Sequence, residues 1–124
     1  MPFKDPNLSF QDILEAITNI EEFTYGMDLD GFRGDPKTIA AVERKLLQIA
    51  EAATRIGDDA GTACPKIPWR DVRGMGNWLR HRYDRVDVEI VWNTVTENLP
   101  PLKACILRFL NPPAAPNPAA PTSE

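Results

Sequence analysis

The 124-residue chain contains one histidine, two cysteines and no long apolar run. A protein metal site needs several closely spaced histidine, cysteine or carboxylate ligands, so the sequence predicts no metal and no cofactor. Cys64 and Cys105 are too few for a disulfide framework, and we expect each to have a structural or merely tolerated role. No stretch approaches the ~20 apolar residues that span a bilayer, and no signal-peptide pattern opens the chain. A cytoplasmic protein without membrane contact is therefore expected.

Hydrophobic residues recur at helical spacing along most of the chain. Asp35 and Asp87 are strong expected N-caps, Ser9 is a further candidate, and Pro100 with Pro101 is expected to end the fourth helix. The predicted fold is an all-α, antiparallel up-and-down bundle of four to five helices, which occupies residues 1–110 as one domain. Helices are predicted over residues 8–25, 35–55, 68–83, 87–98 and 102–110, with loops at 26–34 and 57–67, and the Pro/Ala-rich residues 111–124 are expected to be a disordered tail.

Positive charge is concentrated in one part of an acidic protein. The whole chain has a net charge of −4, whereas residues 69–85 have a net charge of +3. The overall charge argues against indiscriminate binding of nucleic acid. The local patch is suited either to a phosphate backbone or to an acidic partner protein.

The same patch contains a motif. Residues 67–102 read IPWRDVRGMGNWLRHRYDRVDVEIVWNTVTENLPPL. This segment resembles the HepT-like toxins of the HEPN superfamily, small helical ribonucleases encoded in two-gene toxin–antitoxin modules. The residues that carry the resemblance are Trp69, Arg70, Asp71, Gly74, Met75, Asn77, Leu79, His81 and Tyr83.

The family motif is Arg-x-x-x-x-His-x-Tyr, and this chain has Gly76 at the arginine position. The resemblance implies a homodimer that acts on RNA, with tRNA among the possible substrates. It also implies a nucleotidyltransferase antitoxin as partner, which neutralises the toxin by AMPylating the motif tyrosine, here Tyr83.

Cleavage of RNA without a metal needs a base for the 2′-hydroxyl proton, an acid for the leaving 5′-oxygen and a cation for the phosphorane charge. Histidine suits both proton transfers, and a two-fold dimer would present His81 twice. Asn77 lies four residues earlier on the same helical face, where it is expected to assist His81 or contact RNA. In the absence of an arginine at position 76, the candidate cations are Arg73, Arg80 and Arg82, while the expected RNA contacts are Arg70, Arg82 and Arg85.

Two alternatives to an active ribonuclease remain open. In the first, Gly76 has removed the chemistry, and a catalytically degenerate HEPN module binds RNA, a nucleotide or an antitoxin through its arginines. In the second, the protein is a structural helical dimer, His81 is an ordinary histidine and the arginines are solvated or salt-bridged. Toxicity that appears only after the substitution Gly76→Arg would indicate a degenerate site.

Overall fold

Residues 5–81 and 87–112 are described by the computed structural model, and within them every regular element is helical. The prediction of an all-α fold is therefore confirmed. None of the helices in this part of the chain is long and apolar enough to cross a membrane. The elements are α1 (Pro6–Thr24), α2 (Leu29–Arg33), α3 (Pro36–Ile56), α4 (Asp58–Ala63), α5 (Trp69–Arg80), α6 (Val88–Asn93), the π-helical turn η1 (Thr94–Asn98) and α7 (Leu99–Leu110).

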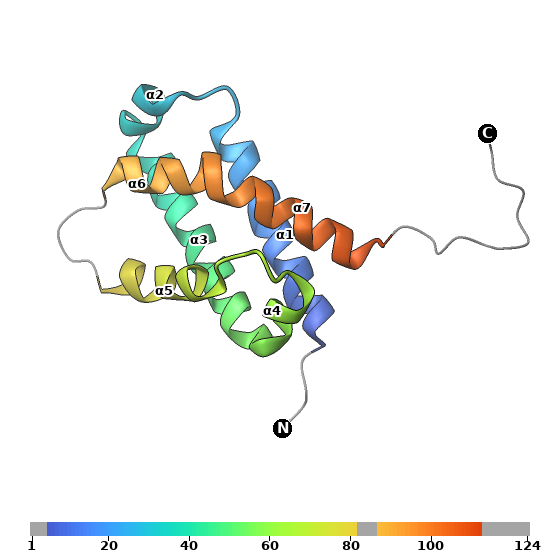
Figure 1. Cartoon of the computed structure of the whole chain (residues 1–124). Coiled ribbons are helices and arrows are strands. Elements are labelled where there is room, and N and C mark those ends of the chain that lie inside the picture. Colours follow the sequence, from blue (N-terminus) through green and yellow to red (C-terminus); the bar gives the residue numbers. More distant parts are fainter. Residues whose placement is uncertain (1–4, 82–86, 113–124) are drawn as a thin grey trace, which may run out of the picture.

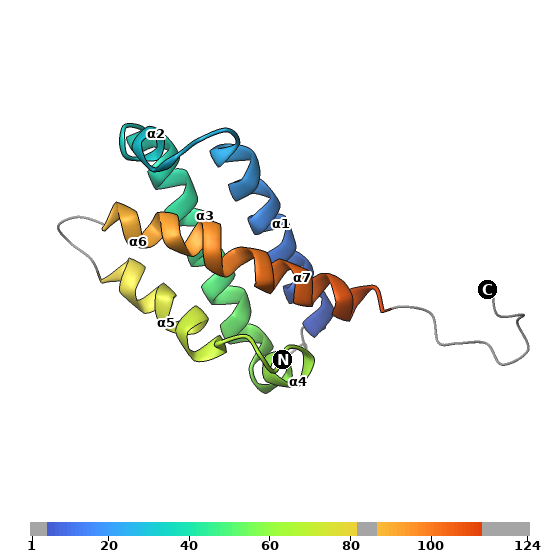
Figure 2. The same ribbon diagram turned by 45° about the horizontal axis from the view of Figure 1, so that its top comes forward.

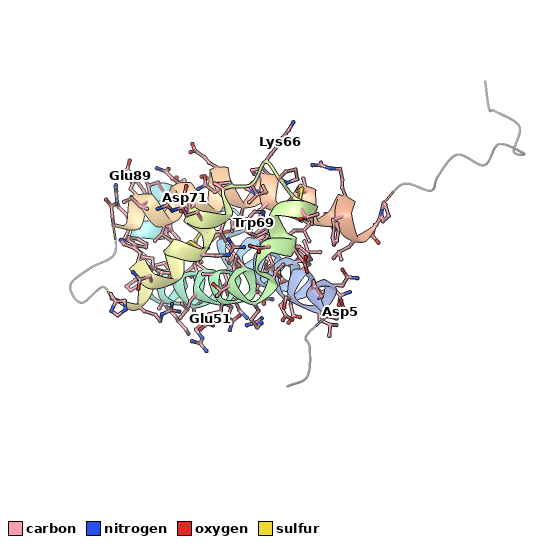
Figure 3. The ribbon with its side chains drawn as sticks, turned by 60° about the horizontal axis from the view of Figure 1, so that its bottom comes forward. Asp5, Glu51, Lys66, Trp69, Asp71 and Glu89 are labelled. Carbon is pink, nitrogen blue, oxygen red and sulfur yellow. A yellow bond between two sulfur atoms is a disulfide. The ribbon has the colours of Figure 1, made fainter. Side chains whose placement is uncertain are left out.

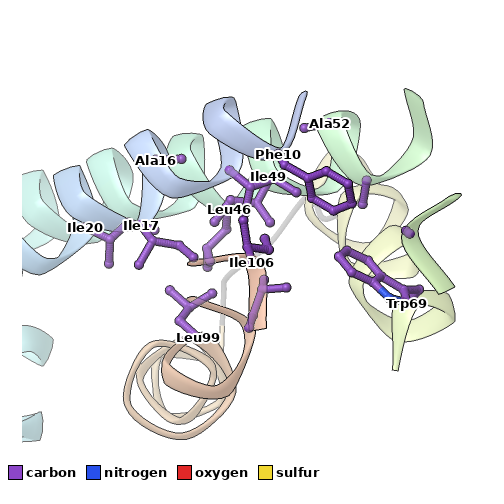
Figure 4. Packing of buried hydrophobic residues seen from close by; sticks show 14 of the residues in the cluster. Phe10, Ala16, Ile17, Ile20, Leu46, Ile49, Ala52, Trp69, Leu99 and Ile106 are labelled. Carbon is purple, nitrogen blue, oxygen red and sulfur yellow. The ribbon is translucent and has the colours of Figure 1, made fainter. Parts of the chain in front are cut away.

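Two layers enclose the core. Helices α1 and α3 lie side by side, and the rod formed by α6, η1 and α7 crosses over them in both views (Figures 1 and 2). Apolar side chains from both layers meet between them (Figure 4), among them Ile17, Ile20, Leu46, Ile49, Leu99 and Ile106. Phe10 extends this core to Trp69 at the start of α5, with ring centroids 6.4 Å apart. Helix α5 thereby joins the same hydrophobic core.

The bounds of α3 follow from its ends, as predicted. The Asp35 carboxylate accepts a hydrogen bond from the backbone N–H of Thr38 at 3.0 Å, and Pro36 occupies the first turn, where a missing N–H costs nothing. That bond from Thr38 is the main cause that lowers the pKa of Asp35 below its ordinary value. The cap therefore stabilises the fold above the carboxyl's ordinary pKa and weakens as the pH falls through the lowered one. Gly57 ends the helix with φ of 67°.

Three local predictions are wrong. Ser9 is buried inside α1, and the N-cap is Asp5, whose side chain accepts from the N–H of Asn7. Both predicted loops contain a short helix. Helix α2 is capped by the Asp28 carboxylate and buries Phe32, and α4 buries Ala60. One buried residue in each helix is too little to produce a periodic pattern in the sequence.

The fourth predicted helix does not end at Asn98. The backbone passes through η1, where the N–H of Leu99 donates to the carbonyl of Thr94, five residues earlier. Pro100 and Pro101 then lie in the first turn of α7. The wider π turn carries the chain into α7, so that these prolines start a helix where we expected them to stop one. Along this segment Val91 is fully buried, while Val88, Trp92 and Val95 pack against the core partly exposed.

Cys64 and Cys105 form a disulfide, with their Cα atoms 6.0 Å apart. The bond joins the C-terminal end of α4 to α7, and the 41-residue separation that it closes contains α5 and α6. Next to it, the indole N–H of Trp69 donates to the Cys64 carbonyl at 2.9 Å. The bond gives both cysteines a structural role, which is one of the two roles that we expected. The pairing itself was not predicted, because the fold brings together residues that no sequence spacing relates.

Candidate functional site

Helix α5 carries most of the motif and has two different sides. One packs along α3, and the other faces η1 and α7 across a groove. In Figure 3, Glu51 lies at the edge of the molecule formed by α3, opposite the edge that carries Lys66 and Asp71. We refer to the contact between α3 and α5 as the seam and to the space between α5 and the rod of α6, η1 and α7 as the groove.

Gly76 lies buried in the seam. A Cβ atom added to it would be only 2.9 Å from the Cβ of Ala50 on α3. Real Cβ atoms essentially never come this close, so a side chain at position 76 would push the two helices apart. The glycine at the motif's arginine position is thus the residue that allows the close packing of α5 on α3.

Arg80 folds back over Gly76. Its two terminal guanidinium nitrogens lie 3.5 and 3.6 Å from the position that a Cβ of residue 76 would take. The direction is natural, because side chains on a helix lean towards its N-terminus and meet the residue four positions earlier. Nη1 of Arg80 also lies 3.8 Å from a carboxylate oxygen of Glu51. A cation therefore occupies the space beside Gly76, although it comes from the next turn of the helix.

Arg73 is bound within the fold. Its Nε donates to the carbonyl of Ala53 at 3.3 Å, and its Nη2 donates to the carbonyl of Gly57 at 2.6 Å. The last carbonyls of a helix lack partners within the helix and carry partial negative charge, so an arginine there is well placed. Arg73 fastens α5 to the C-terminal end of α3.

His81 and Asn77 lie at the exposed C-terminal end of α5. His81 is the C-cap residue, and its backbone N–H donates to the Asn77 carbonyl at 3.1 Å. Both side chains are exposed, as is that of Arg80 directly before His81. Arg70 lies at the other end of α5, on the rim of the groove. Asn77, Arg80 and His81 thus lie within the last turn of α5, whereas Arg70 lies at its other end.

Three predicted site residues lie outside the described part of the chain. They are Tyr83, the predicted modification site, and Arg82 and Arg85, two of the predicted RNA contacts. Among the residues that the structure describes, no group of three or more histidine, cysteine and carboxylate side chains is arranged to hold a metal ion.

The groove on the other side of α5 has a volume of about 640 Å³. Its floor is apolar, and charged residues such as Arg70, Asp71 and Glu97 lie around it. Ile90 lines the groove with 49% of its surface exposed. The main apolar side chains are Val72, Met75 and Trp78 on α5 and Ile90, Leu99 and Leu102 on the opposite wall. An exposed apolar groove with a charged rim is typical of a surface that binds another protein.

The family model described as "Ribonuclease HepT-like" matches residues 13–109. The chain belongs to the HepT-like ribonuclease family. A protein named "Probable ribonuclease HepT", from Thermococcus cleftensis, is 45% identical over 93 residues, which are 75% of this chain and 84% of that protein. A Methanocaldococcus jannaschii protein named a "Putative RNase" is 36% identical over 100 residues, which are 81% of this chain and 83% of that protein. A second "Putative RNase" from the same organism is 33% identical over 103 residues, which are 83% of this chain and 94% of that protein. No solved structure gives a significant match.

Membership of the HepT-like family supports a ribonuclease-type function and an RNA substrate. Gly76 stands at the position of the family's motif arginine, and in this structure it allows the close packing of α5 on α3. The substitution Gly76→Arg is not a clean test of catalysis, since any side chain at this position must first displace α3. Glu51 is the site residue to which the sequence assigned no role. Its partner, Arg80, comes from a distant helix, and only a prediction of the α3–α5 contact would have paired them.

Proposed function

We propose that this HepT-like protein is the toxin of a toxin–antitoxin pair and cleaves RNA without a metal, with tRNA as one candidate substrate. The observation that carries the proposal is the position of Arg80. Arg80 directly precedes His81 in the chain, and its guanidinium lies over Gly76. It therefore offers a positive charge at the position where the motif lacks its own arginine.

In the proposed reaction, His81 of one subunit accepts the proton of the RNA 2′-hydroxyl. The 2′-oxygen attacks the phosphorus, and the bond to the 5′-oxygen breaks. A second His81 gives a proton to that 5′-oxygen, so the products are a 2′,3′-cyclic phosphate and a 5′-hydroxyl. Arg80 stabilises the negative charge of the phosphorane, and Asn77 assists His81 or holds the RNA. Arg73 keeps α5 in place and is not assigned a direct role, because its donors are used within the fold.

The two histidines require a dimer, and we propose a two-fold homodimer that covers the groove. This groove has the apolar floor and the mixed charges on its rim that a self-complementary interface needs. Arg70 on one copy is available to pair with Glu97 on the other, and the reverse pair follows from the two-fold axis.

The proposed regulation uses Tyr83, which the nucleotidyltransferase antitoxin would AMPylate. Phosphate and nucleotide groups two residues from His81 would repel RNA and obstruct the site. We further propose a cytoplasmic location, where RNA and the antitoxin are present. The thiol state of Cys64 and Cys105 in cell extracts tests this location, because disulfides persist mainly in oxidising compartments. Reduced thiols in the extract would support a cytoplasmic location, and a disulfide there would argue for an oxidising compartment.

The proposal is tested by incubating purified protein with total RNA and with tRNA in the presence of EDTA. We expect cleavage by the unmodified chain and new 5′-hydroxyl ends. Arg80→Ala should lose roughly 10²- to 10³-fold in rate, as loss of one charge stabiliser typically does. His81→Ala removes both the base and the acid and should lose at least roughly 10²- to 10⁴-fold. Arg33→Ala, which removes an exposed arginine paired with Glu89 elsewhere, is the control and should retain full activity. Cleavage that persists in His81→Ala would contradict the proposal.

A second candidate is the degenerate HEPN module that binds RNA, a nucleotide or an antitoxin without cutting. The observation in its favour is that Gly76 has a packing role in the seam, which leaves the motif arginine with no counterpart at its own position. Binding of a fluorescent RNA without cleavage, lost in Arg80→Ala, would support this candidate.

A further inference from the structure

The seam contains a small cationic cavity of about 320 Å³ beside Gly76. Three arginines and one carboxylate line it, together with the small residues Ala50 and Thr54; the charged residues are Glu51, Arg55, Arg73 and Arg80. Arg73 donates to the backbone of α3, so the carboxylate of Glu51 has two arginines near it, Arg55 and Arg80.

Arg55 is the residue on the same helix that would be expected to pair with Glu51. The two residues are four apart on α3, with the carboxylate on the N-terminal side, which is the arrangement that favours an ion pair along a helix. The structure instead pairs Arg55 with Asp12 of α1, at 3.3 Å. Glu51 then lies 3.8 Å from Arg80 of α5. Two ion pairs thus connect α1 to α3 and α3 to α5.

We infer that Glu51 is a positioning residue for Arg80 and that Asp12 keeps Glu51 available for this role by holding Arg55. Without Glu51, the Arg80 side chain loses its ion pair across the seam and samples more rotamers. Without Asp12, Arg55 turns to Glu51 and competes with Arg80. The inference rests on the proposed function, because Arg80 is the charge that this function needs.

The ion pair has little to do with stability. The side chains of Arg80 and Glu51 are 50% and 46% exposed, and pairs at this exposure add little to folding. Its effect is on orientation, since a misplaced charge at a reacting phosphate costs rate. A positioning role therefore predicts a lower kcat at unchanged thermal stability, whereas a structural role predicts a lower Tm.

The test is a set of single variants measured for kcat and KM on an RNA oligonucleotide and for Tm. We expect Glu51→Gln to lower kcat by roughly tenfold, as displacement of a positioned group does, with KM and Tm unchanged. Asp12→Asn should lower kcat by a smaller factor. Glu21→Gln is the matched control, because Glu21 forms a similarly exposed pair between helices, with Lys103 at 3.0 Å, away from the seam. It should leave kcat unchanged.

A double-mutant cycle gives the decisive readout. Added to Arg80→Ala, the change Glu51→Gln should have no further effect on kcat, because the residue that it positions is absent. An equal loss in both backgrounds, or an unchanged kcat in Glu51→Gln, would overturn the inference while leaving the ribonuclease proposal intact.

If the unmodified protein cleaves no RNA, the proposed function fails, and NMR relaxation of the Arg80 side-chain Nε still tests the positioning. The order parameter of this group should fall in Glu51→Gln and in Asp12→Asn and stay unchanged in Glu21→Gln. An order parameter that is the same in all four proteins would show that Glu51 does not hold Arg80.

Discussion

The side of α5 that carries Gly76 meets α3 so closely that a methyl group would not fit, whereas an added methyl at Gly74 would touch nothing. The two glycines are two residues apart in one helix, yet Gly76 lies in the seam while Gly74 lines the groove. The seam is a finished contact within the chain. The groove is an apolar surface that the described residues leave open. Helix α5 therefore carries the candidate catalytic cation, Arg80, at the seam and lines an open apolar groove on its other side.

The largest expected effect concerns the disulfide, which joins the C-terminal end of α4 to α7. A bond that closes a 41-residue separation restricts the unfolded chain, and the chain-entropy estimate for this length is about 4 kcal/mol. Reduction with dithiothreitol should therefore lower Tm by on the order of 10 °C, measured by circular dichroism. The variant Cys105→Ala is the control, because it should melt at the lower temperature with or without the reductant. Two free thiols in the untreated protein would show that the bond does not form.

A smaller effect should separate the two glycines. Gly76→Ala brings a methyl group to 2.9 Å from the Cβ of Ala50, and overpacking of this kind costs roughly 1–3 kcal/mol. Gly74→Ala adds the same methyl in open space and should stabilise the helix by up to ~1 kcal/mol, since alanine has the higher helix propensity. Urea unfolding of both variants measures the difference. Equal shifts of the same sign would mean that the seam is looser than the structure has it.

The sequence predicted what depends on neighbouring residues. The start of α3 at Asp35 and Pro36, its end at Gly57 and the Asp87 cap of α6 all follow from local hydrogen bonding, and the structure confirms them. The π-helical turn before Pro100 was not predicted. It depends on a hydrogen bond that spans five residues and on the packing of α6 and α7 against the core, neither of which neighbouring residues determine.

The candidate site shows the same division. The motif located His81, Asn77 and Arg80 at the end of α5. The role of Gly76 depends on Ala50, and that of Glu51 depends on Arg80, so both come from the packing of two helices that no spacing in the sequence relates. The pairing of Cys64 with Cys105 was missed for the same reason.

The smallest effect on stability should accompany a large effect on assembly. Ile90 lines the groove with 49% of its surface exposed, so Ile90→Lys removes little buried area and should change the free energy of unfolding by no more than about 0.5 kcal/mol. If the groove is the dimer interface, however, the charge would be buried against the apolar floor of a second copy, and the dimer should dissociate. Analytical ultracentrifugation of the unmodified protein and the variant measures this.

Leu107→Lys is the matched control for Ile90→Lys. Leu107 is 40% exposed on α7 and does not line the groove, so its substitution should leave the dimer intact. Loss of the dimer in both variants would place the interface elsewhere or make it depend on overall charge. If Ile90→Lys alone loses both the dimer and RNA cleavage, dimerisation through the groove is needed for the active site, because only a dimer presents two copies of His81. The seam would then position Arg80 within each subunit, and the groove would bring the two subunits together.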